Sequence, residues 1–373
     1  MIYDICIRNG KIVDGTGNPW YSGDLFLAND KILAIGKLKD FSIQRTIDAT
    51  GLVVAPGFID AHSHSDTTTL VYRQMENNLM QGMTTVIAGQ CGISLAPMSL
   101  ERRQEIEKLF SSWLPQGIEF QITWTAFDEY LQEEEKAGLG VNVAHLVGHS
   151  AIRASAMGMD ARAPTSDELE AMKILTRDSM EAGAFGLSTG LIYPPGIFSA
   201  TEEIIELAKV AARYGGIYAS HIRGEGKTLI NAVEEAIVIG EKAAIPVQIS
   251  HHKASTKAVW GKSIETLQII ENARKRGIDV TVDQYPYRAG ATSLATLLPP
   301  WVHDGGREKL LERLQSPEMR KKIQIDIETG LPNWENLATS VGWEQVFVTY
   351  VKTTANKPIE GKSMIEIMET RGD

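Results

Sequence analysis

The sequence predicts an α/β protein, a (β/α)8 barrel of the TIM type with seven of its eight strands present, preceded by a small β domain. Residues 1–55 carry short alternating apolar runs broken by Gly, Asn and Asp, which is typical of short strands. From Val53 onward, short apolar strands alternate with amphipathic helices, the order that builds a parallel sheet. The chemically conspicuous side chains follow these strands, where barrel active sites lie.

The first 55 residues predict short antiparallel strands that form the N-terminal part of a small β-sandwich domain, residues 1–55. No helical period competes with the alternation there. The predicted strands are Ile5–Ile7, Lys11–Val13, Asp24–Leu27, Lys31–Ile35 and Arg45–Ile47.

Residues 56–289 predict the barrel, because short apolar runs and helical periods alternate throughout. The strand candidates are Pro56–Ala61, Met83–Ala88, Val141–Val147, Ala184–Leu187, Gly216–Ser220, Pro246–Ser250 and Asp279–Asp283. The helix candidates are Thr165–Glu181, which opens with a capping box of Thr165 and Glu168, then Thr201–Arg213, Lys227–Glu241 and Ile264–Lys275. Residues 290–373 predict a helix-rich insertion that precedes the missing eighth strand.

Composition favours a small-molecule partner. A formal net charge of -10 opposes binding to nucleic acid or to an anionic membrane surface. Only two cysteines occur, Cys6 and Cys91, which is compatible with a reducing compartment. Because the N-terminus lacks a signal-peptide pattern and no run of about 20 apolar residues follows, we predict a cytoplasmic protein. A homo-oligomer is left open.

Two neighbouring predicted strands end in residues of the types that bind metal ions. His62 and His64 close the first barrel strand at positions i and i+2, so alternation places both side chains on one face. Two such histidines could equally be surface polar residues, but the preceding Pro-Gly-Phe-Ile-Asp favours a site. Cys91 closes the next strand between Gly89 and Gly92, although a lone cysteine is more often inert core.

Two further histidines, His221 and His251, end the fifth and sixth strands. The carboxyl ends of barrel strands converge, so four histidines and one cysteine predict that metal is bound there. Nitrogen and thiolate ligands favour zinc over magnesium or calcium. His145 and His303 are weaker candidates, and His149 is predicted to support the site from outside the ligand shell.

The segment from Pro56 to His64 resembles the opening strand of the amidohydrolase superfamily of metal-dependent hydrolases. Together with residues 89–94, 186–193, 220–225 and 250–253, it is similar to the N-acyl-D-amino-acid deacylase (D-aminoacylase) family over essentially the whole chain. The resemblance implies tight zinc binding by Cys91, His221 and His251, and a second, weaker position at His62 and His64. Residues 186–189 lack the lysine that is carbamylated in related cyclic amidases, which favours the deacylases.

The same resemblance implies that Tyr193, Arg223, Lys253 and Tyr285 line a pocket for the free carboxylate of an acyl amino acid. Arg223 could instead form an ion pair with Glu225 or another carboxylate. The family's general base, an aspartate at the end of the eighth strand, has no counterpart, so the catalytic residue is unknown and Asp373 is not proposed for it. We therefore expect a C-terminally shortened chain that also lacks the closing strands of the small β domain.

The predicted function is zinc-dependent hydrolysis of the amide bond of N-acyl-D-amino acids to a carboxylate and a D-amino acid. One alternative is another amidohydrolase acting on a C–N bond, in an N-acyl-D-glutamate, an N-acyl-D-aspartate, a dipeptide or a cyclic amide. Another is a catalytically silent metal-binding protein, because the general base is not identified.

Overall fold

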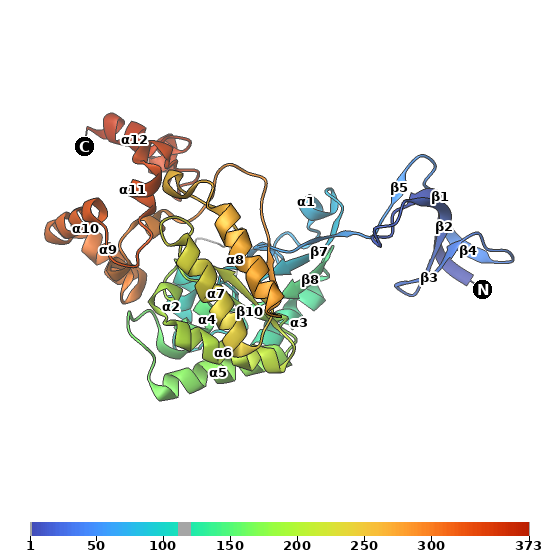
Figure 1. Cartoon of the computed structure of the whole chain (residues 1–373), viewed down its shortest axis with the longest axis horizontal. Helices are drawn as coiled ribbons and strands as arrows, with labels where there is room; N and C mark the ends of the chain where they lie inside the picture. Colours follow the sequence, from blue (N-terminus) through green and yellow to red (C-terminus); the bar gives the residue numbers. More distant parts are fainter. Residues whose placement is uncertain (1, 111–120, 373) are drawn as a thin grey trace. The chain divides into compact units, whose positions relative to one another are not determined.

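The computed structural model describes residues 2–110 and 121–372, and it forms two compact units (Figure 1). The first unit comprises Met1–Ile59 with Gly82–Thr84. The second comprises Asp60–Gln81 with Thr85–Asp373. Asp373 itself lies outside the described residues.

The first unit is a five-stranded sheet in the order β3-β2-β1-β4, with β5 also paired to β1. Its strands are β1 (Ile2–Ile12), β2 (Tyr21–Ala28), β3 (Lys31–Gly36), β4 (Ser42–Asp48) and β5 (Val53–Val54). The predicted antiparallel pairing holds for β1–β2 and β2–β3 but is wrong for β4 and β5, which run parallel to β1. β3 pairs with the edge of β2 that faces away from β1. The chain then returns to the opposite edge of β1, where β4 pairs with it.

A bulge joins two predicted strands into β1. The register shifts between Ile7 and Gly10, and Asn9 adopts a left-handed backbone with φ of 63°. The N–H of Asn9 donates to the Asp24 carboxylate at 2.9 Å, so the irregularity keeps a hydrogen bond. The runs at Ile5–Ile7 and Lys11–Val13 are therefore one bent strand.

Outside the five-stranded sheet, residues 58–59 and 83–84 of the first unit and the whole second unit contribute the predicted parallel strands of the barrel, which confirms the fold class. They are β6 (Phe58–Asp60), β7 (Met83–Ala88), β8 (Asn142–His145), β9 (Val147–Gly148), β10 (Gly186–Gly190), β11 (Ile217–His221), β12 (Val247–Ile249) and β13 (Val280–Val282). They form two sheets, β6-β7-β8 and β13-β12-β11-β10-β9. The predicted third strand is divided at Leu146, because its first half pairs with β7 and its second half with β10.

Helices cover the outside of these strands (Figure 1). The first are α1 (Glu76–Leu79), α2 (Arg103–Phe110), α3 (Phe127–Ala137) and α4 (His149–Met157). The next are α5 (Ser166–Glu181), α6 (Thr201–Arg213), α7 (Leu229–Ala243) and α8 (Ser263–Lys275), each within two residues of its predicted bounds. Thr165 caps α5 and forms the predicted box with Glu168. Buried faces of α2 to α8 and of β9 to β13 share one apolar core, whereas Val86 of β7 packs in a separate cluster with Met75 and Val141.

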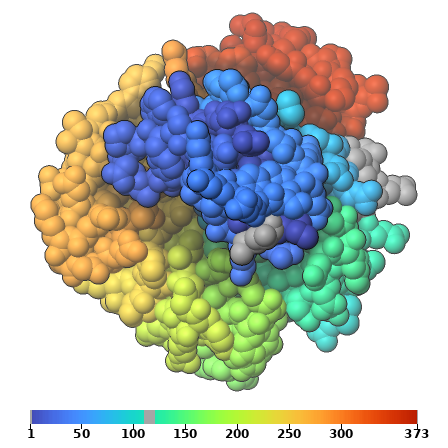
Figure 2. Space-filling view, turned by 90° about the vertical axis from the view of Figure 1, so that its right-hand side faces the viewer, coloured from blue at the N-terminus to red at the C-terminus, as the bar shows by residue number. Residues whose placement is uncertain are grey.

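The segment after β13 is helical. It contains α9 (Gly306–Gln315), α10 (Pro317–Thr329), α11 (Leu337–Val341) and α12 (Met364–Arg371), which gather on one side of the second unit (Figures 1 and 2). In the described ranges, neither sheet pairs β13 with β6. No described helix has the length and apolar character needed to cross a membrane.

Candidate metal centre and substrate pocket

The loop after β7 presents Cys91 in a constrained conformation. Gly89, Cys91 and Gly92 all have positive φ, with 56° at the cysteine, a conformation that costs a non-glycine residue about 1–3 kcal/mol. Ser188 on β10 holds this loop by accepting the Gly92 N–H at 3.1 Å and donating to the Gly89 carbonyl. A Cβ at Gly190 would collide with the Cys91 carbonyl, so glycine there allows the two segments to approach.

Two groups of three side chains meet at Cys91. One comprises His62, His64 and Cys91, and the other comprises Cys91, His221 and His251. Within each group the donor atoms lie within 4.8 Å of one another. All five residues predicted from the sequence as metal ligands are thus brought together, and each group could hold one ion.

The sulfur–nitrogen separations fit a tetrahedral metal. The Cys91 Sγ lies 3.6 Å from His62 Nε2 and 3.6 Å from His251 Nε2. Zinc bonds of about 2.3 Å to sulfur and about 2.0–2.1 Å to nitrogen would place two tetrahedral ligands about 3.5 Å apart. The Cys91 thiol is therefore spaced to serve both groups.

Burial keeps three of the candidate ligands, His64, His221 and Cys91, neutral. Desolvation, with His62 and His251 nearby, lowers the pKa of His64 to about 3, and burial also lowers the pKa of His221 well below its usual range. Burial, followed by repulsion from Glu225 and Asp283, raises the pKa of the Cys91 thiol. Among the described residues, neither ring nitrogen of His221 has a hydrogen-bond partner, which is costly unless a metal binds there.

Two carboxylates that were not predicted as site residues hold the histidine rings. Asp283, just after β13, lies 3.2 Å from Nδ1 of His62 and also accepts the His251 backbone N–H at 2.6 Å. Glu225, after β11, lies 2.8 Å from Nδ1 of His251. Each contact leaves the ring's Nε2 facing Cys91, the arrangement in which metal-ligating histidines are usually oriented.

Three of the four predicted substrate residues lie beside this centre. The Tyr193 ring packs edge-on against His221, with centroids 4.9 Å apart. Lys253 donates to the His251 carbonyl at 2.7 Å and also to Glu225. The Lys253 ammonium lies 5.2 Å from the centre of the Tyr285 ring. One cation and two phenols therefore surround the histidines.

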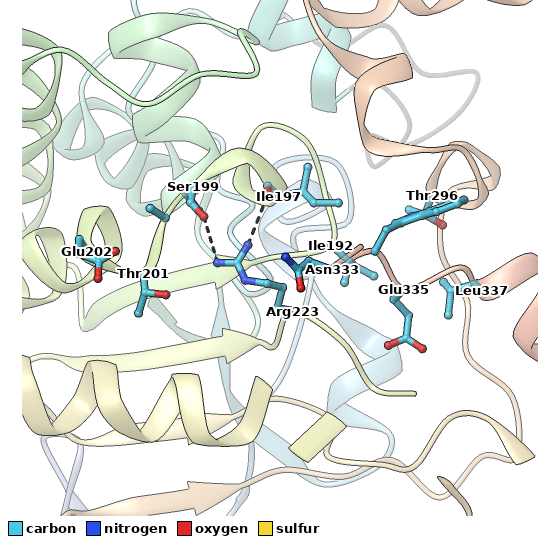
Figure 3. Close-up of a pocket in the computed structure, with 12 residues that line it drawn as sticks. Ile192, Ile197, Ser199, Thr201, Glu202, Arg223, Thr296, Asn333, Glu335 and Leu337 are labelled. Carbon is cyan, nitrogen blue, oxygen red and sulfur yellow. Dashed lines mark hydrogen bonds between the residues drawn. The ribbon is translucent and has the colours of Figure 1, made fainter. Parts of the chain in front are cut away.

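Arg223 is paired within the fold. Its guanidinium contacts both oxygens of Glu235 on α7, with a shortest distance of 2.8 Å. It also donates to the carbonyls of Ile197 and Ser199, the dashed lines of Figure 3. The sequence left open an ion pair of Arg223 with Glu225 or another carboxylate, and the partner in the structure is Glu235. These contacts pin the loop that carries Tyr193.

A cavity of about 350 Å³ opens beside Arg223 (Figure 3). Its walls combine apolar side chains with acids, and the lining residues are Ile192, Ile197, Ser199, Ala200, Thr201, Glu202, Arg223, Thr296, Asn333, Trp334, Glu335 and Leu337. Ile192 precedes Tyr193, so the loop that carries Tyr193 also lines the cavity. Because Arg223 is neutralised by Glu235, the remaining charges of the lining are the carboxylates of Glu202 and Glu335.

Of the four histidines outside the ligand groups, the three that were weighed from the sequence belong to separate environments. His145 pairs with Glu134 at 2.6 Å, and His149 pairs with Glu203 at 2.8 Å, all of them buried. Burial lowers the pKa of His303 to about 4. None of the three belongs to either ligand group among the described residues.

Known proteins are similar to this chain in both sequence and fold. A profile of the amidohydrolase family matches residues 45–341. The chain is 42% identical to a D-aminoacylase from Alcaligenes xylosoxydans xylosoxydans over 292 residues, covering 78% of this chain and 59% of the relative. It therefore spans about three fifths of that relative's length.

Two solved structures extend the similarity. An N-acyl-D-glutamate deacylase from Bordetella bronchiseptica, complexed with zinc and a phosphonate mimic of the tetrahedral intermediate, has a TM-score of 0.79 and 31% identity, covering 100% of this chain and 68% of that one. A D-aminoacylase with a binuclear metal centre has a TM-score of 0.72 and 38% identity, covering 87% and 69%. By sequence and fold together, the chain belongs to the amidohydrolase family, in the branch of the N-acyl-D-amino-acid deacylases.

Proposed function

We propose that the chain binds zinc through Cys91, His221 and His251, with a second, weaker position at His62, His64 and Cys91, and hydrolyses N-acyl-D-amino acids. The observation that carries the proposal is the single thiol within reach of both histidine groups. A bound divalent ion polarises the amide carbonyl and lowers the pKa of water toward neutrality. Thiolate and imidazole donors are those that favour zinc.

The side chains around the centre suit an acyl amino acid. Lys253, with the hydroxyls of Tyr193 and Tyr285, is placed to hold the free carboxylate, and a charge-assisted hydrogen bond there fixes the substrate's direction. We place the amino-acid side chain in the cavity beside Arg223. Asp283 and Glu225 are committed to the histidine rings, so we name neither as the general base.

The zinc-loaded chain is expected to release D-methionine from N-acetyl-D-methionine and to leave the L-enantiomer intact. N-acetyl-D-glutamate and N-acetyl-D-aspartate should react more slowly, because Glu202 and Glu335 repel a second carboxylate; about 1.4 kcal/mol of repulsion lowers the rate about tenfold. Chromatography of the released amino acids measures both ratios.

The same panel should contain a dipeptide and a hydantoin. Ring opening of the hydantoin without hydrolysis of any linear amide would refute the proposal in favour of a cyclic amidase. Zinc binding without turnover of any compound would instead support a silent metal-binding protein.

Zinc binding is expected to release one proton from Cys91 at pH 7.5. The thiol's pKa is raised, so it is protonated before binding, whereas His64 and His221, whose pKa values are lowered, have no proton to lose. Zinc affinity should therefore rise about tenfold per pH unit near neutrality. Calorimetric titration in two buffers of different ionisation enthalpy measures the proton count, and binding of the first ion without proton release would exclude the thiol as a ligand.

A further inference from the structure

Glu225 contacts two functional side chains at once. Its Oε1 accepts a hydrogen bond from Lys253 Nζ and lies 2.8 Å from His251 Nδ1. Its Oε2 accepts a hydrogen bond from Ser255 Oγ at 3.0 Å. The Glu225 side chain is only 13% exposed, so these contacts replace most of the hydrogen bonds that water would otherwise make to its carboxylate. One oxygen is thus shared between a proposed zinc ligand and the lysine proposed to bind substrate.

The loop that carries Glu225 is built around a second carboxylate, from the distant residue Glu335. The Glu335 Oε2 accepts the backbone N–H of Gly226 at 2.9 Å and the hydroxyl of Thr228 at 3.2 Å. A Cβ on Gly224 or Gly226, the two neighbours of Glu225, would collide with the Glu335 carboxylate. Glycine on both sides therefore lets Glu335 enter the loop, where it is 9% exposed.

Glu335 belongs to the helical segment that follows β13 and lies at the wall of the cavity shown in Figure 3. Its contacts are made to Gly226 and Thr228, one and three residues after Glu225. A shift of Glu335 would therefore move the backbone that carries Glu225. A contact that served only to attach the segment to the second unit would not need to be made to the loop that carries Glu225.

We infer that Glu225 is a positioning residue for both His251 and Lys253, and that Glu335 fixes Glu225, so that residues 290–373 help to set zinc affinity. The inference deepens the proposed function and rests on it. Carboxylates that orient metal-ligating histidines typically contribute 10–100-fold to metal affinity. The general base and the substrate side chain are not involved in this effect.

The test is zinc affinity, measured by competition with a chromophoric chelator. Glu225→Gln is expected to weaken zinc binding about 10–100-fold. Glu335→Gln keeps the size of the side chain but removes its charge. It should weaken zinc binding about fivefold, because a hydrogen bond to a charged group is only modestly stronger than one to a neutral group. The matched control is Glu369→Gln, on an exposed position of α12 in the same segment, which should bind like the unsubstituted chain.

Cobalt(II) adds a readout that a purely structural role would not change. Glu225→Gln should alter the visible absorption bands of bound cobalt, while Glu369→Gln leaves them as in the unsubstituted chain. Unfolding midpoints of the metal-free variants identify any variant that fails to fold.

Unchanged zinc affinity and cobalt spectrum in folded Glu225→Gln would overturn the inference. Unchanged values for Glu335→Gln alone would overturn the part that concerns residues 290–373. If the unsubstituted chain takes up no zinc, or Cys91→Ala binds it equally well, the proposed function fails instead.

Discussion

Replacing Cys91 with alanine is expected to remove zinc binding from both ligand groups. The Cys91 Sγ lies 3.6 Å from a histidine nitrogen of each group, so one substitution takes a ligand from each. Altering partners outside the ligand shell already costs 10–100-fold in affinity, so losing the shared ligand should cost more than about 100-fold. Elemental analysis after dialysis against dilute zinc measures the loss.

Cys6→Ala provides a matched control for this experiment. Cys6 is the chain's other cysteine, and it is also buried, but in the sheet of the first unit. Cys6→Ala should retain the full zinc content. Equal zinc contents for the two variants would contradict the account, because the thiol of Cys91 would then have no special role.

Replacing Glu203 with alanine is expected to destabilise the second unit by about 3–5 kcal/mol, the usual cost of leaving a buried charge unpaired. Its Oε1 lies 2.8 Å from His149 Nε2 and accepts a hydrogen bond from Arg153 Nε at 3.1 Å. The Arg153 side chain is 0% exposed. Without Glu203, the hydrogen bonds left to its guanidinium within the described part of the chain are those to the Asp160 and Arg162 carbonyls. Urea unfolding followed by tryptophan fluorescence measures the change.

Glu202→Ala is the control, because Glu202 is exposed in the same first turn of α6. It should change the free energy of unfolding by less than about 0.5 kcal/mol. The double variant Arg153→Met with Glu203→Leu should recover most of the lost stability, because it removes both buried charges. A small effect of Glu203→Ala, equal to that of Glu202→Ala, would contradict the assignment.

The elements that the sequence predicted correctly are those with local signals. The capping box at Thr165 and the apolar runs at Met83–Ala88 appear in the structure where the pattern places them. The parallel pairing of β4 with β1, and the division of the third barrel strand, depend on which distant strand is the neighbour. No short-range pattern encodes that choice.

The candidate site shows the same division between local and distant information. Ligands at strand ends could be predicted, because parallel barrel strands all end at one rim. The roles of Asp283 and Glu225 could not, since a lone carboxylate after a strand has no distinctive spacing. Glu335 lies 109 positions from Gly226, and only the fold brings them together. Arg223 pairs with Glu235 on α7 rather than with a carboxylate of its own loop.

The most direct test of the account is zinc K-edge X-ray absorption of the chain loaded with one and then two equivalents of zinc. A shared Cys91 thiolate predicts one sulfur per zinc at about 2.3 Å in both samples, together with nitrogen or oxygen at about 2.0–2.1 Å. A spectrum with nitrogen and oxygen alone at one equivalent would contradict the account, because the metal would then bind without Cys91.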